Sequence, residues 1–223
     1  MRALMAISVS RLLRRRDRPS RAIARALQTT ALGRISPHER TWVDRIEARF
    51  RHQGNMEAGI TPLWGLFLMR LLRELEPRSC LELGTGWGTS GAYQAAALEL
   101  NEAGFLVTCD IEPEWARAAE REFGELGLHR VELRLGPLND TLGPQLASME
   151  PVDYAFIDAD HEEEAESGYF EAMLPHLSPG AVIVFDDINF NEGMKRVWKA
   201  IRGHERVSLA IGLRRMGITV VNV

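Results

Sequence analysis

The sequence predicts an α/β protein with a mostly parallel sheet, helices on both faces of that sheet and a helical extension before it. After Pro77, strand-like and helix-like stretches alternate, which is typical of a parallel sheet covered on both sides. The last two strand-like stretches are joined by a short polar turn, which indicates one antiparallel strand. The chain has 223 residues, 45% hydrophobic and 26% charged, and these values fit one globular domain with a sizeable core.

Three helices are expected before the alternating region. A partial apolar stripe predicts an amphipathic helix over residues 4–28, broken near Pro19. Residues 37–51 carry apolar side chains at four-residue spacing and predict a second helix. A third begins at Thr61 and Pro62, with Thr61 as N-cap and Pro62 at the first helical position.

The alternating region supplies the sheet and its covering helices. Strands are predicted at 80–83, 105–109, 131–135, 152–157 and 181–185. Helices are predicted between and after them, at 88–102, 114–126, 139–147, 163–176 and 192–203. The chain ends in two β-like stretches, 206–211 and 217–223, on either side of the polar turn at Arg214-Arg215.

Charge is distributed unevenly along the chain. Residues 1–51 hold 13 arginines and four acids, a net charge of +9, and the remaining residues hold 14 basic and 27 acidic side chains, a net charge of −13. Such an arm can bind nucleic acid or an acidic membrane, but we favour a helix folded back on the chain's own acidic body. The Arg-rich, acid-poor start also fits an organelle transit peptide, but not a secretory signal.

Cysteine usage and hydropathy bear on where the protein works. Two cysteines cannot form a disulfide framework, so a reducing cytoplasm is the expected location. No run of 18 apolar residues occurs, because Arg70 interrupts the best candidate, residues 59–72.

A glycine-rich loop between the first strand and its helix is the first functional signal. It reads Glu82-Leu83-Gly84-Thr85-Gly86-Trp87-Gly88-Thr89-Ser90. Glycines allow a tight turn and close approach of a ligand, and the helix N-terminus beyond offers free N–H groups. The second strand ends at Asp110, where a carboxylate can accept hydrogen bonds from a ribose diol. Together these features predict a nucleoside-bearing cofactor.

Glu82 discriminates between two such cofactors. An NAD site must hold a pyrophosphate, which a carboxylate just before the glycines would repel. S-adenosylmethionine instead carries an ammonium group that an acid suits, so we favour it and keep an NAD-dependent dehydrogenase as an alternative. After the third strand, the amide of Asn139 can pair with an adenine edge, or it can cap the following helix.

Acidic residues after the fourth and fifth strands are the second signal. Asp158, Asp186 and Asp187 are expected to converge at the carboxyl ends of the strands, beside the cofactor. Three close carboxylates repel one another unless a cation neutralises them, and an all-oxygen set suits Mg²⁺, Mn²⁺ or Ca²⁺. The alternative is that these side chains cap strand and helix ends.

His161 lies close to this acidic group. Its reference pKa of about 6.5 suits a general base near neutrality. It is otherwise a solvated loop histidine whose pKa the neighbouring glutamates raise.

From about residue 58 to its end, the chain resembles the class I S-adenosylmethionine-dependent methyltransferases. Within them it is most similar to the catechol and caffeoyl-CoA type O-methyltransferases. The residues that carry the resemblance are Ile60–Gly65, Glu82–Ser90, Asp110-Ile111, Gly136 to Asp140, Asp158-Ala159-Asp160 and Asp186-Asp187. The resemblance implies a Rossmann-like methyltransferase fold, with a seven-stranded sheet of order 3-2-1-4-5-7-6 and an antiparallel strand seven.

The resemblance also implies roles for individual cofactor-binding residues. Glu82 and Ser90 would hold the methionine end, above a floor formed at Gly84. Asp110 would take the ribose hydroxyls, and Ile111 and Asn139 would flank the adenine. Further cofactor contacts are expected from Thr61, Thr85, Gly86, Trp87, Gly136 and Asp158.

Two positions of the catalytic centre depart from the family pattern. Asp158, Asp186 and Asp187 match the family's metal ligands, but the family has Asn where this chain has Asp187. The family commonly has Lys as the base where this chain has His161. Asp158 and His161 are therefore the expected catalytic residues.

We predict O-methylation of a small hydroxylated molecule, with a catechol or vicinal diol favoured and a divalent cation, Mg²⁺ first, assisting. One alternative is a metal-independent methyltransferase acting on another hydroxyl or an amine. Another is a non-catalytic cofactor-binding module whose Arg-rich arm holds RNA or a membrane. Residues 1–57 are expected to form an arm or lid outside a methyltransferase domain at 58–223, which favours a homodimer.

Overall fold

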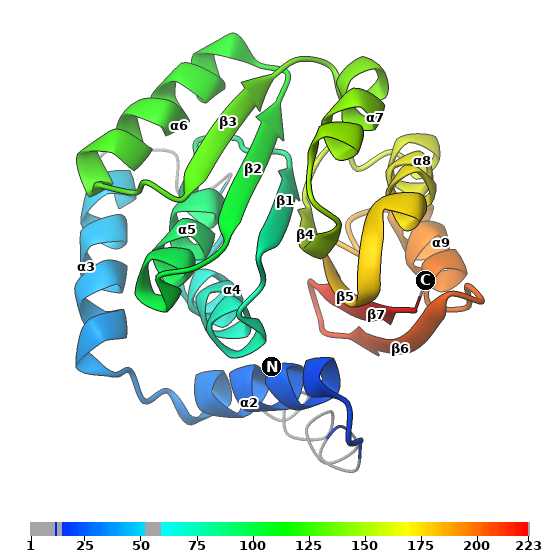
Figure 1. Cartoon of the computed structure of the whole chain (residues 1–223), viewed down its shortest axis with the longest axis horizontal. Helices are drawn as coiled ribbons and strands as arrows, with labels where there is room; N and C mark the ends of the chain where they lie inside the picture. The colour runs from blue at the N-terminus through cyan, green and yellow to red at the C-terminus, as the bar shows by residue number, and fades with distance from the viewer. Residues whose placement is uncertain (1–11, 13–14, 52–58, 223) are drawn as a thin grey trace.

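The computed structural model describes residue 12, residues 15–51 and residues 59–222, leaving aside the side chains of residues 139 and 140. In this part of the chain, seven strands form one sheet in the order β3-β2-β1-β4-β5-β7-β6 (Figure 1). Strand β7 pairs antiparallel with both β5 and β6, while the pairs among β1 to β5 are parallel. The predicted fold class, strand order and antiparallel strand seven are confirmed.

The strands are β1 (Ser79–Leu83), β2 (Phe105–Asp110), β3 (Val131–Leu135), β4 (Val152–Ile157), β5 (Leu177–Phe185), β6 (Val207–Gly212) and β7 (Gly217–Val221). The helices are α2 (Arg18–Leu32), α3 (Pro37–Arg51), α4 (Pro62–Leu75), α5 (Thr89–Asn101), α6 (Pro113–Leu126), α7 (Leu138–Ser148), α8 (Glu163–Met173) and α9 (Glu192–Ile201). A short 3₁₀ turn, Leu174–His176, follows α8, so the helix expected to run to residue 176 ends earlier.

The predicted helix over 4–28 is wrong in its position. Helix α2 begins at Arg18 and runs to Leu32, and Pro19 lies in its first turn instead of breaking it. Asp17 caps this start by accepting a hydrogen bond from the backbone N–H of Ser20 at 2.9 Å. Proline is tolerated in a first helical turn, because the N–H that it lacks would have no partner there. Residues 4–11, 13 and 14 lie outside the described residues.

Two apolar layers separate the sheet from its helices. On one face, α2 to α6 pack against side chains of alternate strand positions such as Tyr154 and Phe156. On the other face, α7, α8 and α9 cover the intervening positions, among them Ala155 and Ile157. This alternation is the two-residue period of strands buried on both sides. The layers leave the carboxyl ends of the parallel strands at one edge of the molecule.

The first two described helices pack against the rest of the chain. Figure 1 shows α2 crossing beneath α4 and α3 standing beside α5 and α6. Arginines of both helices contact acids of the body, in the pairs Arg18–Glu76 at 2.8 Å, Arg25–Glu74 at 3.3 Å and Arg49–Glu122 at 2.7 Å. The boundary predicted at residue 57 falls outside the described residues, and the homodimer and the RNA or membrane contact stay predictions.

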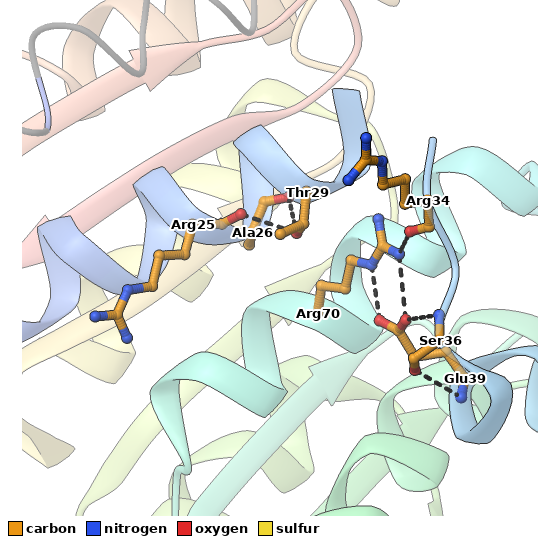
Figure 2. Close-up of polar contacts among 7 residues, drawn as sticks. All are labelled: Arg25, Ala26, Thr29, Arg34, Ser36, Glu39 and Arg70. Atoms are coloured by element: carbon orange, nitrogen blue, oxygen red, sulfur yellow. Dashed lines mark hydrogen bonds and ion pairs between the residues drawn. The ribbon is translucent and has the colours of Figure 1, made fainter. Parts of the chain in front are cut away.

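Arg70 joins α4 to the segment between α2 and α3. Its side chain is 5% exposed and pairs with Glu39 at 2.8 Å (Figure 2). The guanidinium also donates to the carbonyl of Arg34, while Glu39 accepts from the backbone N–H of Ser36 at 2.8 Å. A polar residue inside an apolar run of α4 is therefore matched by charges from the N-terminal segment.

Among the described residues, no helix combines the length and the apolar character of a membrane-spanning segment.

Candidate functional site

A cavity of about 430 Å³ opens at the carboxyl ends of β1, β2 and β4. This volume falls within the range of small-molecule and cofactor sites. One half, the cofactor end, is lined by the glycine loop, Asp110 and nearby apolar side chains. The other half, the acidic end, is lined by Asp158, Asp160 and His161, with Asp186 and Asp187 beside them. The cavity therefore lies where parallel α/β sheets bind their ligands.

The backbone of the glycine loop is clamped between three strand ends. The backbone N–H groups of Gly84 and Thr85 both donate to the carbonyl of Cys109, at 3.0 and 3.1 Å. Gly84 has a φ of +90°, and a Cβ at this position would lie 1.9 Å from the carbonyl oxygen of Asp158. Only glycine allows so close an approach with this backbone conformation. Gly84 therefore lies where the ends of β1 and β4 approach most closely, and its role as the floor of the cofactor site stays a prediction.

Asp110 is held in place by two backbone donors. Its Oδ2 accepts from the N–H of Gly86 at 2.7 Å, and its Oδ1 accepts from the N–H of Glu112 at 2.9 Å. The side chain is nearly buried and still lines the cavity. A carboxylate has about four lone-pair sites, so it can bind a diol while keeping both of these bonds. This arrangement suits the ribose role predicted for Asp110.

Glu82 lies beneath the cavity instead of lining it. It is fully buried and accepts hydrogen bonds from Gln94 and Thr108, each at 2.6 Å. Burial raises the pKa of Glu82 to about 7, although hydrogen bonds from Thr108, Ser90 and Gln94 oppose that rise. Glu82 accepts a hydrogen bond from Ser90, which does line the cavity. The role of Glu82 at the methionine end of the cofactor stays a prediction.

An apolar wall faces Asp110 across the cofactor end. Trp87, Ile111, Pro137 and Leu138 line it, and Ile111 leaves 57% of its surface exposed there. Trp115 joins this wall, with its ring centroid 6.2 Å from that of Trp87. Trp115 was not among the predicted site residues, although a tryptophan in the first helical turn after Asp110 was a usable signal. Flat apolar side chains of this kind suit a nucleobase.

The other predicted cofactor contacts have mixed outcomes. Thr85, Gly86 and Ser90 line the cavity. Gly136 braces Asp110, because its N–H donates to the Asp110 carbonyl at 2.9 Å. Thr61 is exposed, and among the described residues its neighbours Gly59 and Ile60 line the cavity in its place. The side chain of Asn139 lies outside what the structure describes.

At the acidic end, His161 lies between two carboxylates. Its Nε2 is 3.3 Å from Asp158 Oδ1 and 3.6 Å from Asp187 Oδ2. Both His161 and Asp187 have positive φ, at 56° and 48°, which is uncommon outside glycine. Such strained positions are often found at functional sites.

The two carboxylates change the chemistry expected of His161. The contacts with Asp158 and then Asp187 raise the pKa of His161 to about 10, against burial, which lowers it. These contacts favour the imidazolium form, which has no lone pair with which to accept a proton. The general-base role of His161 stays a prediction from the sequence.

Asp186 faces away from the His161 pair and toward Arg215. The Arg215 Nε donates to Asp186 Oδ1 at 2.7 Å and lies 3.3 Å from Asp187 Oδ1. Asp186 is 1% exposed, and burial raises its pKa, with the charge of Asp158 adding to the rise. Arg215 was not among the predicted site residues. It lies in the polar turn before β7, which the sequence marked only as a turn.

Among the described residues, the three predicted metal ligands do not gather into one compact set. Oδ1 of Asp186 accepts from Arg215 and, at 2.8 Å, from the backbone N–H of Asp187, while within the described part of the chain its Oδ2 is buried without a hydrogen-bond partner. Among the described residues, the ligand atoms that do lie within 4.8 Å of one another belong to Asp158, His161 and Asp187. That second set contains an imidazole in place of the third carboxylate.

Comparison with known proteins agrees with the fold. A family model described as a methyltransferase domain matches residues 81–188. Over 132 residues the chain is 36% identical to a catechol O-methyltransferase from Niastella koreensis, and the match covers 58% of each protein. The chain spans less than two thirds of the length of the first curated relatives it matches.

Solved structures match over more of the chain. An O-methyltransferase from Bacillus cereus in complex with SAH is 26% identical, with a TM-score of 0.64, over 96% of this chain and 95% of that one. The O-methyltransferase TomG from Streptomyces achromogenes, in complex with SAM, is 24% identical, with a TM-score of 0.67, over 85% and 92%. The second likeness is one of fold alone. In its fold and over the matched residues, the chain is similar to class I S-adenosylmethionine-dependent O-methyltransferases.

Proposed function

We propose that the chain binds S-adenosylmethionine and transfers its methyl group to a hydroxyl of a small molecule. The observation that carries this proposal is Asp110, which is held by two backbone donors and lines the cavity together with apolar side chains. A ribose diol on Asp110 places the adenine against Trp87 and Ile111. The methionine end then points along the glycine loop toward Ser90 and Asp158, at the acidic end.

The reaction follows from the charges of the reactants. The acceptor oxygen forms a bond to the methyl carbon as the bond from that carbon to the sulfonium breaks, and neutral S-adenosylhomocysteine leaves. The protein therefore has to align oxygen, carbon and sulfur, a proximity effect worth several kcal/mol. The hydroxyl proton becomes strongly acidic as its oxygen gains the new bond. Asp158, which lines the cavity, is the carboxylate placed to receive it.

The acidic end favours an aromatic hydroxylated acceptor. The His161 ring lies 5.2 Å from that of Phe190, and Phe190 leaves 68% of its surface exposed. An aromatic ring against Phe190 brings a hydroxyl close to Asp158 and the imidazolium of His161. A positive charge beside a phenol lowers its pKa and makes it a better nucleophile. We therefore keep a catechol as the first acceptor class to test.

Metal-assisted transfer is a second candidate. It is favoured by the gathering of Asp158, His161 and Asp187 within 4.8 Å, a set that would need His161 to lose its proton. When bound, a divalent cation would act as a Lewis acid toward the acceptor hydroxyl. Magnesium stays a prediction from the sequence, and the imidazole in this set suits other divalent ions better.

The direct test is transfer of a labelled methyl group from S-adenosylmethionine to a panel of catechols, matched single phenols and aliphatic diols, with EDTA and with added Mg²⁺. Expected is labelled ether product from at least one phenol or catechol, and its loss in Asp158→Asn. An Asp153→Asn variant is a matched control, because Asp153 accepts backbone N–H bonds from Arg78 and Ser79 at the opposite end of the sheet. Transfer to amines but to no hydroxyl would contradict the proposal.

A further inference from the structure

Arg215 is brought to the acidic end by the topology of the sheet. Strand β7 pairs antiparallel with β5 in a register that sets Gly217 opposite Phe185. The residues just before β7 therefore lie beside the residues just after β5. A backbone hydrogen bond from the N–H of Ile188 to the carbonyl of Arg215, at 3.0 Å, fixes the turn against that loop.

The guanidinium reaches two carboxylates at once. Its Nε lies 2.7 Å from Asp186 and 3.3 Å from Asp187. The Asp186 side chain has no exposed surface, while that of Arg215 is 27% exposed. A buried carboxylate without a partner is strongly disfavoured, and Arg215 is the described side chain that donates to Asp186. The guanidinium keeps its charge at any physiological pH.

We infer that Arg215 supplies the positive charge at this acidic cluster in place of a divalent cation, so that the proposed methyl transfer needs no metal. This inference rests on the proposed function. The physical reason is electrostatic. Arg215 contacts Oδ1 of Asp186 and Oδ1 of Asp187, so a cation held by the remaining oxygens of these two residues would lie close to a fixed positive charge. Arg215 acts as a positioning residue, because it orients Asp186 and Asp187 and does not line the cavity.

The test is direct binding of Mn²⁺ to the full chain, followed by the electron paramagnetic resonance signal of the free ion. The wild type is expected to bind Mn²⁺ no tighter than about 1 mM, a weak affinity for a protein site. Arg215→Met frees both carboxylates, and we expect at least about tenfold tighter binding. Arg214→Met is the matched control, since Arg214 is the exposed neighbour in the same turn, and it should behave as the wild type.

A charge-retaining variant and a separate cofactor titration distinguish loss of the Arg215 charge from loss of folding or of the cofactor site. Arg215→Lys retains the charge and should retain weak Mn²⁺ binding, even if Arg215→Met does not fold. Titration of S-adenosylhomocysteine into each sample reports on the cofactor site separately, so a failure there points to the proposed function and not to Arg215. Micromolar Mn²⁺ binding by the wild type, or methyl transfer abolished by EDTA and restored by Mn²⁺, would overturn the inference. Weak binding by the wild type with tighter binding by Arg215→Met supports it.

Discussion

At the cofactor end of the cavity, backbone groups hold the functional residues, whereas at the acidic end side-chain charges hold one another. Asp110 receives its hydrogen bonds from the N–H groups of Gly86 and Glu112, close to it in the fold and fixed by the strand ends. Asp186, by contrast, takes its partner from a turn 29 residues away. The geometry of the cofactor end therefore depends on the backbone fold. The geometry of the acidic end depends on the identity of a few side chains.

The two ends of the cavity should differ in how strongly they respond to sequence changes. Backbone donors are present in any sequence that adopts the fold, so the ribose site is preserved with it. A cluster of side-chain charges changes character when one residue changes, and Asp187 and His161 are the two positions where this chain departs from the family pattern. The acidic end is therefore where we expect this chain to differ most from its relatives.

The largest effect is expected where the backbone of the cofactor end is disturbed. Gly84→Ala places a methyl group 1.9 Å from the Asp158 carbonyl and should destabilise the protein by about 4 kcal/mol or more, with loss of S-adenosylhomocysteine binding. Gly86→Ala meets nothing within 4 Å, so only its positive φ is strained, at a cost of about 1 kcal/mol. Thermal unfolding and calorimetry compare the two, and equal losses would mean that φ alone matters.

The ion pair of Arg70 and Glu39 is buried and lies away from the cavity. Its loss shows how much a buried charge pair contributes to the free energy of unfolding of this chain. Arg70→Met leaves Glu39 and the Arg34 carbonyl without their partner, and should lower the free energy of unfolding by about 3 kcal/mol. The pair of Arg25 with Glu74 is more exposed, so Arg25→Met should cost about 0.5 kcal/mol or less. Urea unfolding measures both. A change in S-adenosylhomocysteine affinity in either variant would contradict the separation of this network from the site.

Replacing one carboxylate oxygen of Asp110 by an amide nitrogen should weaken cofactor binding. Asp110→Asn puts an amide N–H₂ against one of the two backbone donors, and we expect roughly 10- to 100-fold weaker binding of S-adenosylhomocysteine. Asp153→Asn removes similar bonds at the far end of β4 and should leave that affinity unchanged. Calorimetric titration decides between them, and an unchanged affinity in Asp110→Asn would remove the ribose role.

The smallest effect is a pH dependence at the acidic end. Because the pKa of His161 is raised to about 10, its contribution to stability is full below the unfolded value of about 6.5 and is lost as the pH rises to about 10. In EDTA, the wild type should therefore exceed His161→Gln in stability by about 1 kcal/mol at pH 6, and the difference should shrink toward pH 10.

Two buried acids titrate in part of the same pH range. Burial raises the pKa values of Glu82 and Glu166 to about 7, and both groups are present in the wild type and in the variant. The titration of Glu82 therefore cancels in the difference between the two unfolding curves, whereas Glu166 contributes to it, because the charge of His161 lowers the pKa of Glu166. A difference that stays constant with pH would show that His161 is not charged in the folded protein.

Most of the fold followed from local sequence patterns. Strand and helix alternation located the sheet and its covering helices, and glycines at a strand end located the cofactor loop. The start of α2 was harder, because Pro19 fits both a helix break and a first helical turn. Asp17, one residue before the helix, was the signal that distinguishes the two.

The acidic end was less predictable, for a physical reason. Sequence spacing brings Asp158, Asp186 and Asp187 to one edge of the sheet, but it does not say which cation meets them. Arg215 becomes a candidate only when the antiparallel register of β7 is considered, because that register carries the turn back to the end of β5. The buried position of Glu82 likewise depends on Gln94 and Thr108 surrounding it, which no motif contains.

The central claim is that this cavity holds S-adenosylmethionine by its ribose and adenine without help from a metal. Calorimetric titration of S-adenosylhomocysteine into EDTA-treated protein tests it most directly, with NADH titrated in parallel. We expect a Kd of about 10 μM or tighter for S-adenosylhomocysteine and no binding of NADH. Folded protein that binds NADH, or that binds S-adenosylhomocysteine only after a divalent cation is added, would contradict it.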